Sequence, residues 1–325
     1  MGAPIKQKIC VISFDHWNYD KHIVKVLNEN GIQSFHIKIG NFKYKNNWER
    51  IQNTFSKVFL GKNPKLIKRQ EYILQQLEEK GFQNQILVIN PELIDLEYHL
   101  KIKKYTDKYI AYLYDSVSRC SVKHLLDSVF DEIFSFDKAD VLTYGFSETT
   151  NYIYFDTPKK AAVEKQNFIY IGSIDNRLKF LNDFGEHIKK HQQSFLFYAI
   201  GKKAFINKLK QIFLGKNKNI IFKHKRFTQN ETLKMYSESE IIVDLVRDNQ
   251  SGLSFRIFEA LGLQKNIITN NNSITTYDIY NSGKIVYLDD LHKMNKISFS
   301  NSKYSVELID KYQIQNWVKK IFLLQ

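Results

Sequence analysis

The chain is poor in cysteine, proline and glycine. Its 325 residues include two cysteines, four prolines and thirteen glycines. Cys10 and Cys120 form no Cys-x-x-Cys pair, so a disulfide framework is excluded and no cysteine-type zinc site is expected. So few prolines and glycines also argue against a linker-rich or low-complexity chain. The 43% of hydrophobic residues is enough for ordinary folded cores.

Long apolar stretches are missing too. No run of 18 or more apolar residues occurs, so the sequence predicts no transmembrane helix. The first residues lead into lysines and a short strand, not into the apolar core of a signal peptide. These two features lead us to expect a cytoplasmic protein.

Positive charge is in clear excess. Forty-eight Lys and Arg residues stand against 34 Asp and Glu residues, a formal net charge of +14. Such an excess favours contact with anions, such as nucleic acid, lipid headgroups or phosphorylated substrates. A solvated, generally lysine-rich surface accounts for the charge equally well. Phe42–Trp48 and Lys101–Tyr109 interleave lysines with aromatic residues and are the stretches best suited to rest on a membrane.

Apolar strand patterns alternate with helical patterns along the chain. Lys8–Ser13 predicts a strand, Lys21–Asn30 a helix that stops at Gly31, and Ile32–Ile39 a second strand. This order implies a parallel sheet covered by helices. A second series of the same kind starts at Asn167, so we expect an α/β chain with two consecutive parallel sheets.

The length and one polar segment divide the chain. At 325 residues it exceeds the usual size of a single hydrophobic core, so we expect two domains. Thr157–Gln166 reads TPKKAAVEKQ and interrupts the alternation, which makes it the candidate linker. The expected N-terminal domain covers residues 1–157 and the second covers residues 158–304. Residues 305–325 predict a helix that packs either on the second domain or back on the first.

A glycine turn follows the first strand of the second half. Phe168–Leu178 reads FIYIGSIDNRL, so a strand runs into Gly172 and Ser173 just before a helix. Glycine lets a ligand approach the backbone, and the N-terminus of a helix offers N–H donors to phosphate. Arg177 would add a bidentate phosphate contact. A plain β-α turn with a solvated arginine explains these residues equally well.

A second turn carries more polar residues. Residues 250–272 read QSGLSFRIFEALGLQKNIITNNN, a polar turn followed by a short helix and a strand. Arg256 would neutralise the charge of a diphosphate, and Glu259 would accept hydrogen bonds from ribose hydroxyls. The alternative is a surface ion pair between these two residues, worth ~0.3 kcal/mol. The turn residues that would face the diphosphate are Gln250, Ser251, Gly252 and Ser254.

These two segments carry a resemblance to a known family. GLSFRIFEALGLQKNIITNN resembles the nucleotide-sugar motif of GT-B glycosyltransferases, and YIGSIDNRLKFL resembles the turn that opens their second lobe. The first motif is most similar to bacterial lipopolysaccharide and exopolysaccharide transferases with a CgeB-like or group 1-like C-terminal motif. The resemblance is specific over Phe168–Asn272 and weak before it. It implies two Rossmann-like α/β lobes with parallel sheets facing across a cleft, the acceptor side first and the nucleotide-sugar side second.

The resemblance also assigns roles. It implies that Glu259 holds the donor ribose and that Gly252 lies in the diphosphate loop. Retaining members of the family carry a glutamate one residue before this glycine, where the present chain has Ser251. We therefore expect an inverting transferase, which needs a general base for the acceptor hydroxyl.

Candidates for that base follow strands of the first half. Asp15 and His16 lie in FDHWNY after the first strand, and Asp115 lies in YDSVSR after a later one. Asp15 and Asp115 could equally cap helices, and His16 could be a structural histidine. No Asp-x-Asp sequence ends a strand, so we expect no essential metal.

The resemblance implies a glycosyltransferase of bacterial cell-surface polysaccharide or lipopolysaccharide assembly. The nucleotide sugar is its substrate, a glycan or lipid-linked molecule its acceptor, and no cofactor is expected. A basic enzyme suits the inner face of the cytoplasmic membrane, with peripheral contact to anionic lipid. Two alternatives stay open. One is a basic nucleic-acid-binding protein, although no binding motif is present. The other is another nucleotide-sugar-using α/β enzyme such as an epimerase, without a dinucleotide fingerprint after the first strand.

Overall fold

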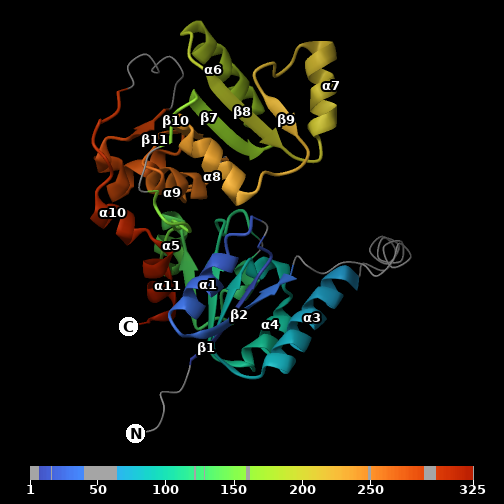
Figure 1. Ribbon diagram of the computed structural model, residues 1–325. Coiled ribbons are helices and arrows are strands. Elements are labelled where there is room, and N and C mark those ends of the chain that lie inside the picture. The colour runs from blue at the N-terminus through green and yellow to red at the C-terminus, as the bar shows by residue number, and fades with distance from the viewer. Residues whose placement is uncertain are drawn as a thin grey trace. The chain divides into compact units, whose positions relative to one another are not determined.

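The computed structural model describes residues 7–15, 17–39, 64–120, 122–127, 129–158, 162–247, 250–288 and 298–324. The chain divides into two compact units (Figure 1). Unit 1 comprises Met1–Thr150 and Ile314–Gln325, and unit 2 comprises Asn151–Gln313. The boundary expected after residue 157 falls inside unit 2. Ile153 already belongs to unit 2, because its backbone N–H donates to the carbonyl oxygen of Tyr312 at 2.8 Å.

Unit 1 is built on a parallel sheet of six strands in the order β2-β1-β3-β4-β5-β6. The central strands are apolar on both faces because helices cover both sides of the sheet. β1, for instance, reads KICVIS and is buried from its second residue onward. The strands span Lys8–Ser13 (β1), Gln33–Lys38 (β2), Gln83–Ile89 (β3), Thr106–Leu113 (β4), Glu132–Ser135 (β5) and Ser147–Glu148 (β6).

Helices lie on both faces of the unit 1 sheet (Figure 1). α3 and α4 pack on the face that carries Cys10, Ile86 and Tyr109, whereas α1 and α11 contact each other. The α-helices span Lys21–Glu29 (α1), Pro64–Lys80 (α3), Leu96–Lys103 (α4), Lys138–Tyr144 (α5) and Ile314–Phe322 (α11), with short 3-10 turns at Pro91–Leu93 and Lys123–Leu125.

Unit 2 also holds a parallel six-stranded sheet, in the order β12-β11-β10-β7-β8-β9. Two such α/β units confirm the predicted fold class. The strands span Gln166–Ser173 (β7), Phe195–Ile200 (β8), Ile221–Lys223 (β9), Ser239–Asp244 (β10), Asn266–Thr269 (β11) and Ile285–Tyr287 (β12). The α-helices span Leu178–Lys190 (α6), Ala204–Leu214 (α7), Gln229–Ser237 (α8), Phe255–Gly262 (α9) and Val306–Lys311 (α10), with 3-10 turns at Asn272–Thr276 and Asp278–Ser282.

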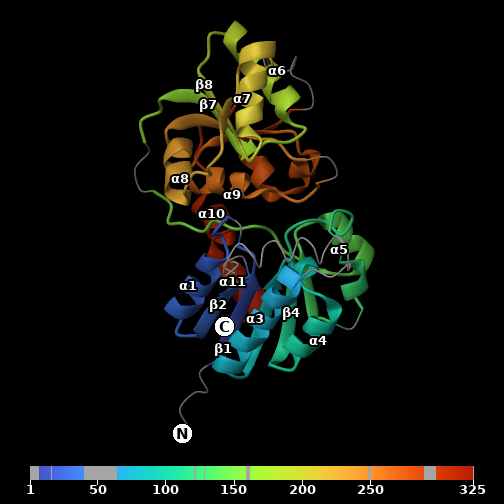
Figure 2. The ribbon, with the colours of Figure 1, turned by 90° about the vertical axis from the view of Figure 1, so that its right-hand side faces the viewer.

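The two faces of the unit 2 sheet have separate cores. Alternate residues of a strand point to opposite faces, so Ile169 and Ile171 of β7 join the core beneath α8 and α9, whereas Phe168 and Tyr170 join the core beneath α6. Figures 1 and 2 show α6 and α7 on one side of the strands and α8 and α9 on the other. Among the helices that the structure describes, none is long and apolar enough to cross a bilayer.

The last helical segment is shared between the units. The sequence pattern predicts one helix within residues 305–325, but the structure has α10 in unit 2 and α11 in unit 1. The break falls at Tyr312 and Gln313, because Gln313 forms a β-bridge with Ile153. α11 is then anchored in unit 1, where the indole N–H of Trp317 donates to the carbonyl oxygen of Thr150 at 2.8 Å.

The anchoring of α11 leads to a stability prediction. Trp317 is 5% exposed, so Trp317→Ala should lower the free energy of unfolding by about 3–5 kcal/mol through lost burial and a lost hydrogen bond. Leu323→Ala is the matched control, since this neighbouring side chain is 70% exposed and its loss should change stability by less than about 0.5 kcal/mol. Urea unfolding followed by circular dichroism measures both variants. Equal unfolding midpoints would contradict a core role for α11.

Candidate functional site

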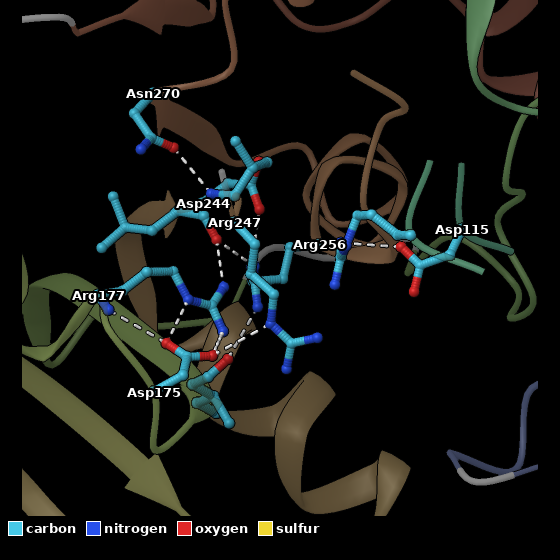
Figure 3. A network of polar contacts seen from close by, with 11 residues as sticks. Asp115, Asp175, Arg177, Asp244, Arg247, Arg256 and Asn270 are labelled. Atoms are coloured by element: carbon cyan, nitrogen blue, oxygen red, sulfur yellow. Dashed lines mark hydrogen bonds and ion pairs between the residues drawn. The ribbon is translucent and has the colours of Figure 1, made fainter. Parts of the chain in front are cut away.

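Three arginines gather at one edge of unit 2 (Figure 3). β7 and β10 are neighbouring parallel strands, so the loops that follow them leave the sheet at the same edge. Arg177 follows β7, Arg247 follows β10, and Arg256 lies in the first turn of α9. The carboxyl ends of parallel strands are where ligands bind in folds of this kind.

Asp175 holds two of the three arginines. Arg177 donates to both of its carboxylate oxygens, from Nε at 2.8 Å and from Nη2 at 2.6 Å. Arg247 donates from Nε to Oδ2 at 3.2 Å. Burial acts to raise the pKa of Asp175, but the two arginines outweigh it and hold the pKa below its ordinary value. The carboxylate is therefore charged at neutral pH and fixes both guanidinium groups.

Asp244 holds the third arginine from the end of β10. Its side chain is fully buried, and its Oδ1 accepts from Arg256 Nε at 2.9 Å and from Ser254 Oγ at 2.7 Å. Its Oδ2 accepts from Thr269 Oγ1 of β11 at 2.9 Å. Burial acts to lower the pKa of Arg256, yet the adjacent Asp244 carboxylate raises it overall, so the arginine stays charged. A buried charge needs such a partner.

Backbone carbonyl groups join the two ion pairs into one network. The Leu245 carbonyl oxygen accepts from Arg177 Nη1 at 2.5 Å and from Arg256 Nη2 at 3.0 Å. Arg256 Nη1 also donates to the carbonyl oxygen of Ile171 at 3.1 Å, which reaches the end of β7. Three arginines and two aspartates leave one positive charge in excess. Arg247 has the most exposed side chain of the three arginines, at 43%, so it can present donors to an anion.

Two buried hydroxyl groups lie in the segments at this edge. The Tyr170 hydroxyl and the Ser251 hydroxyl have no hydrogen-bond partner among the described residues. Unpaired buried polar groups are rare in folded proteins and often mark a place where a ligand or water completes the bonding. Gly172 gives the Tyr170 ring its space, since a Cβ atom there would lie 2.1 Å from the Tyr170 hydroxyl oxygen. The predicted glycine is thus required by packing.

The predicted turn before α9 is tied into the unit. Ser254 bonds Asp244 as described, and the Asn271 side-chain amide donates to the carbonyl oxygens of Ser251 at 3.3 Å and Gly252 at 3.2 Å. The backbone N–H of Gln250 donates to the Arg247 carbonyl oxygen at 3.2 Å. These bonds give the turn one defined shape at the N-terminus of α9. Ser173, the last residue of β7, is half-buried at the same edge.

Arg256 and Glu259 do not form the ion pair that was the alternative interpretation of this helix. Arg256 pairs with Asp244 of β10 instead. Glu259 is 2% exposed, and its Oε1 accepts from the Tyr154 hydroxyl at 2.7 Å. The predicted contact between Glu259 and a ribose stays a prediction.

Unit 1 carries the candidates for a general base. Asp15 is buried, with Oδ1 accepting the Asp20 backbone N–H at 3.1 Å and Oδ2 lying 3.3 Å from Lys38 Nζ. Its backbone adopts the left-handed conformation, with φ of 44°, a strained geometry that is common beside functional sites. Asp115 pairs with Arg119 Nη1 at 2.9 Å. His16 lies outside the described residues.

Sequence reasoning missed Asp20, which lies beside Asp15. Asp20 is buried at the start of α1, and its Oδ1 accepts from the Tyr114 hydroxyl at 2.5 Å. Burial, then the charge of Asp15, raises the pKa of Asp20 to about 7. One feature of the sequence could have indicated Asp20: it is the aspartate directly before the predicted helix that starts at Lys21. The sequence interpretation gave the role of helix cap to Asp15 instead, but the residue at the N-cap of α1 is Asp20.

Nothing in the sequence pattern singled out Arg247, Asp175 or Asp244 as site residues. Val246 precedes Arg247, and its backbone N–H donates to Asn270 Oδ1 at 2.8 Å, which ties the backbone at Val246 to the residue that follows β11. Within the described residues, no group of three or more His, Cys, Asp or Glu residues could hold a metal ion. The unit 2 edge presents arginine, hydroxyl and backbone N–H donors, which are groups that can bind an anion.

No family model matches the sequence. No curated protein matches it either. Solved structures match over almost the whole chain, and three of them illustrate the kinds of enzyme found. The lipopolysaccharide outer core galactosyltransferase WaaB, apo form, is 13% identical with a TM-score of 0.56, over 98% of this chain and 100% of that one. A UDP-N-acetylglucosamine 2-epimerase from Rickettsia bellii is 13% identical with a TM-score of 0.57, over 98% and 96%.

The third structure contains a nucleotide. It is an alpha-glucosyltransferase in complex with UDP and a 13-mer DNA containing an HMU base, 14% identical with a TM-score of 0.56, over 98% of this chain and 95% of that one. At such identities the likeness establishes the fold alone, two Rossmann-like α/β lobes of the GT-B type. That fold is shared by transferases and epimerases alike.

The buried Asp20 leads to a prediction for pH dependence. The pKa of Asp20 is 3.8 in the unfolded chain and about 7 in the folded chain. At pH values between these two, Asp20 holds a proton in the folded state that it has lost in the unfolded state. The free energy of unfolding should therefore fall as pH rises through this window, by about 4 kcal/mol in total. Asp20→Asn keeps the shape but cannot ionise, so it should flatten the slope and stabilise the protein at pH 8.

Urea unfolding at pH 5 and pH 8 tests this. Asp107→Asn is the control, because Asp107 is an exposed carboxylate of the same unit, and it should leave the slope of the wild type in place. If Asp20→Asn shows the same slope as Asp107→Asn, Asp20 does not titrate in this window.

Proposed function

We propose that the chain is a glycosyltransferase that moves a sugar from a nucleotide-sugar donor to a glycan or glycolipid acceptor. The observation that carries the proposal is the arginine network at the carboxyl edge of the unit 2 sheet, with its excess positive charge. A GT-B fold supports it, since structures of that fold include galactosyl- and glucosyltransferases, one of them in complex with UDP.

The donor diphosphate binds where Arg247 meets the N-terminus of α9. Arg247 makes the direct phosphate contact, while Arg177 and Arg256, tied to Asp175 and Asp244, hold positive charge behind it. The free N–H groups of a helix N-terminus add to the attraction. Glu259 accepts from the ribose, a role suggested by the sequence motif. The remaining contacts are assigned to Gly172, Ser173, Gln250, Ser251, Gly252 and Ser254.

The reaction we propose is a direct displacement with inversion. The acceptor hydroxyl oxygen attacks the anomeric carbon, and a general base takes its proton. The bond between that carbon and the diphosphate oxygen breaks, and the nucleoside diphosphate leaves with the electron pair. Fixed arginines stabilise the charge on the leaving oxygen without reorganising. The mechanism therefore needs no metal, and Ser251 in place of a carboxylate offers no nucleophile for a retaining route.

The general base comes from unit 1. Asp15 is our first choice because it is a carboxylate held in a strained turn at the end of β1, next to Asp20, whose pKa of about 7 suits proton exchange at neutral pH. Asp115, which follows β4, and His16 are the other candidates. Both aspartates lie at carboxyl ends of parallel strands, the edge where substrates bind in such sheets.

The biological role we propose is assembly of a bacterial cell-surface polysaccharide or lipopolysaccharide, by a cytoplasmic enzyme at the inner face of the membrane. The sequence motif resembles transferases of these pathways, and one protein of similar fold is a lipopolysaccharide galactosyltransferase. The net charge of +14 suits phosphorylated or lipid-linked acceptors.

A nucleotide-sugar 2-epimerase is the second candidate. The likeness to the Rickettsia bellii epimerase is as strong as the likeness to the transferases. The same arginine network would then hold the diphosphate of a single substrate. An epimerase changes the sugar of its nucleotide without an acceptor, so products formed from the nucleotide sugar alone separate the two functions.

Donor binding is the first test. Calorimetry against UDP-, GDP-, CMP- and dTDP-sugars should find one base that binds. Arg247→Ala should weaken that binding about 10- to 100-fold, because a charge-assisted hydrogen bond is worth about 1.5–3 kcal/mol. Lys189→Ala removes an equal charge in the last turn of α6 and should change affinity less than about twofold. Absence of binding to every nucleotide sugar, or equal affinities for both variants, would overturn the proposal.

Stereochemistry tests the mechanism. With an α-linked nucleotide sugar, proton NMR of the first product should show the β anomer. Asp15→Asn should lower kcat by about 10²–10⁴-fold and leave donor affinity unchanged, because a general base acts on the acceptor and not on the donor. An α product would contradict the inverting mechanism. Full activity of Asp15→Asn would show that Asp15 is not the general base.

A further inference from the structure

α7 turns its apolar face away from the unit 2 sheet. The helix joins β8 to the edge strand β9 and lies beside β9 at the margin of the sheet (Figure 1). Its inward side carries small and polar residues: Ala204 is buried, and the Gln211 side-chain amide donates to the carbonyl oxygens of Asn217 at 2.7 Å and Ile220 at 3.0 Å. A helix on a globular core normally faces the core with its apolar stripe. In α7 the orientation is reversed.

The outward side forms one continuous apolar stripe. At 3.6 residues per turn its side chains fall within an arc of about 120°. Phe213 is 77% exposed and Ile212 is 73% exposed, values that are rare for large apolar side chains side by side. The stripe consists of Phe205, Ile206, Leu209, Ile212 and Phe213, all exposed.

Positive charge frames this stripe on every side. Lys208 and Lys210 lie on its two flanks by helical geometry, and both are exposed. Between Gly201 and Asn230 the sequence has eight lysines and one arginine and no acidic residue. Other exposed lysines stand at the two ends of the helix, namely Lys202, Lys203, Lys216 and Lys218.

We propose that α7, with its apolar stripe and flanking lysines, binds the surface of an anionic lipid bilayer. The stripe enters the boundary between headgroups and acyl chains, and the long lysine side chains extend to the lipid phosphates. A second copy of this chain fits the stripe poorly, because pairing α7 with itself brings lysines of the same sign together. An anionic bilayer offers apolar depth and negative charge together, which matches both parts of this surface.

The surface differs from those that the sequence suggested. Lys101–Tyr109 buries Ile102 and Tyr109 in the core of unit 1, so it offers little apolar surface to a membrane. Phe42–Trp48 lies outside the described residues. In sequence, the apolar residues of α7 have the pattern of an ordinary packed helix, and only the exposure of its side chains shows which way it faces.

Vesicle binding by the full chain tests the proposal. The protein should sediment with phosphatidylcholine vesicles that contain about a third phosphatidylglycerol. It should bind at least about 25-fold less to phosphatidylcholine alone, because each of the two flanking lysines contributes roughly fivefold near an anionic surface. The double variant Ile212→Ser/Phe213→Ser should bind at least about tenfold more weakly. Lys208→Gln/Lys210→Gln should also weaken binding, and high salt should abolish the difference between the charge variant and the wild type.

Val306→Ser is the matched control. Val306 is an exposed apolar residue of α10 in the same unit, at 68%, and its loss should leave vesicle binding unchanged. All substituted side chains are exposed, so each variant should have the same urea midpoint of unfolding as the wild type. If the apolar variant has a shifted midpoint, the comparison uses Lys208→Gln/Lys210→Gln instead. Sedimentation velocity without lipid measures whether the chain forms a dimer, which tests the alternative that a second copy covers the stripe.

Three results would overturn the proposal. These are no binding to anionic vesicles, equal binding by Ile212→Ser/Phe213→Ser and Val306→Ser, or a dimer of the wild type that the stripe variant dissociates. The proposal names a surface for the membrane location proposed above, and it does not depend on the transferase activity. Calorimetry with nucleotide sugars on the same proteins keeps the two apart, since the stripe variant should bind the donor like the wild type.

Discussion

The buried carboxylate of Asp244 is the constraint on which the edge of unit 2 depends. An ion without exposure to water requires charged and hydrogen-bonding partners, and three segments supply them. Ser254 and Arg256 come from α9 and its cap, and Thr269 comes from β11. The requirement of one charge therefore brings the helix N-terminus, the arginine and the neighbouring strand to defined positions. The Arg256 bond to Ile171 then extends the same constraint to β7.

The arginines of this edge divide their tasks. Arg177 and Arg256 spend their donors on aspartates and on the shared Leu245 carbonyl, so they fix the backbone where β7 and β10 end. Arg247 shares Asp175 with Arg177 through a single bond and keeps much of its guanidinium in solvent. A site built in this way has its positive charge in place before a ligand arrives, which reduces the ordering cost of binding.

Much of the fold follows from local sequence pattern, because strand and helix periods are local. Lys8–Ser13 was predicted with the bounds that the structure has. The site followed only in part, because its contacts depend on which strands become neighbours. The alternative interpretation paired Arg256 with Glu259 of its own helix, but β10 lies beside the helix and offers Asp244. Likewise the partner of Asp20 is Tyr114, the residue directly after β4, which no local pattern could indicate.

The return of α11 to unit 1 has a consequence for the newly made chain. Unit 1 needs α11 against its sheet, yet all of unit 2 is translated between Thr150 and Ile314. At about 5–20 residues per second, the ribosome leaves the first unit incomplete for on the order of ten seconds or more. During that time the surface that Trp317 and Phe322 later cover is open to water and to other nascent chains. The order of the segments along the gene thus leaves apolar surface of unit 1 uncovered until residues 314–325 have been made.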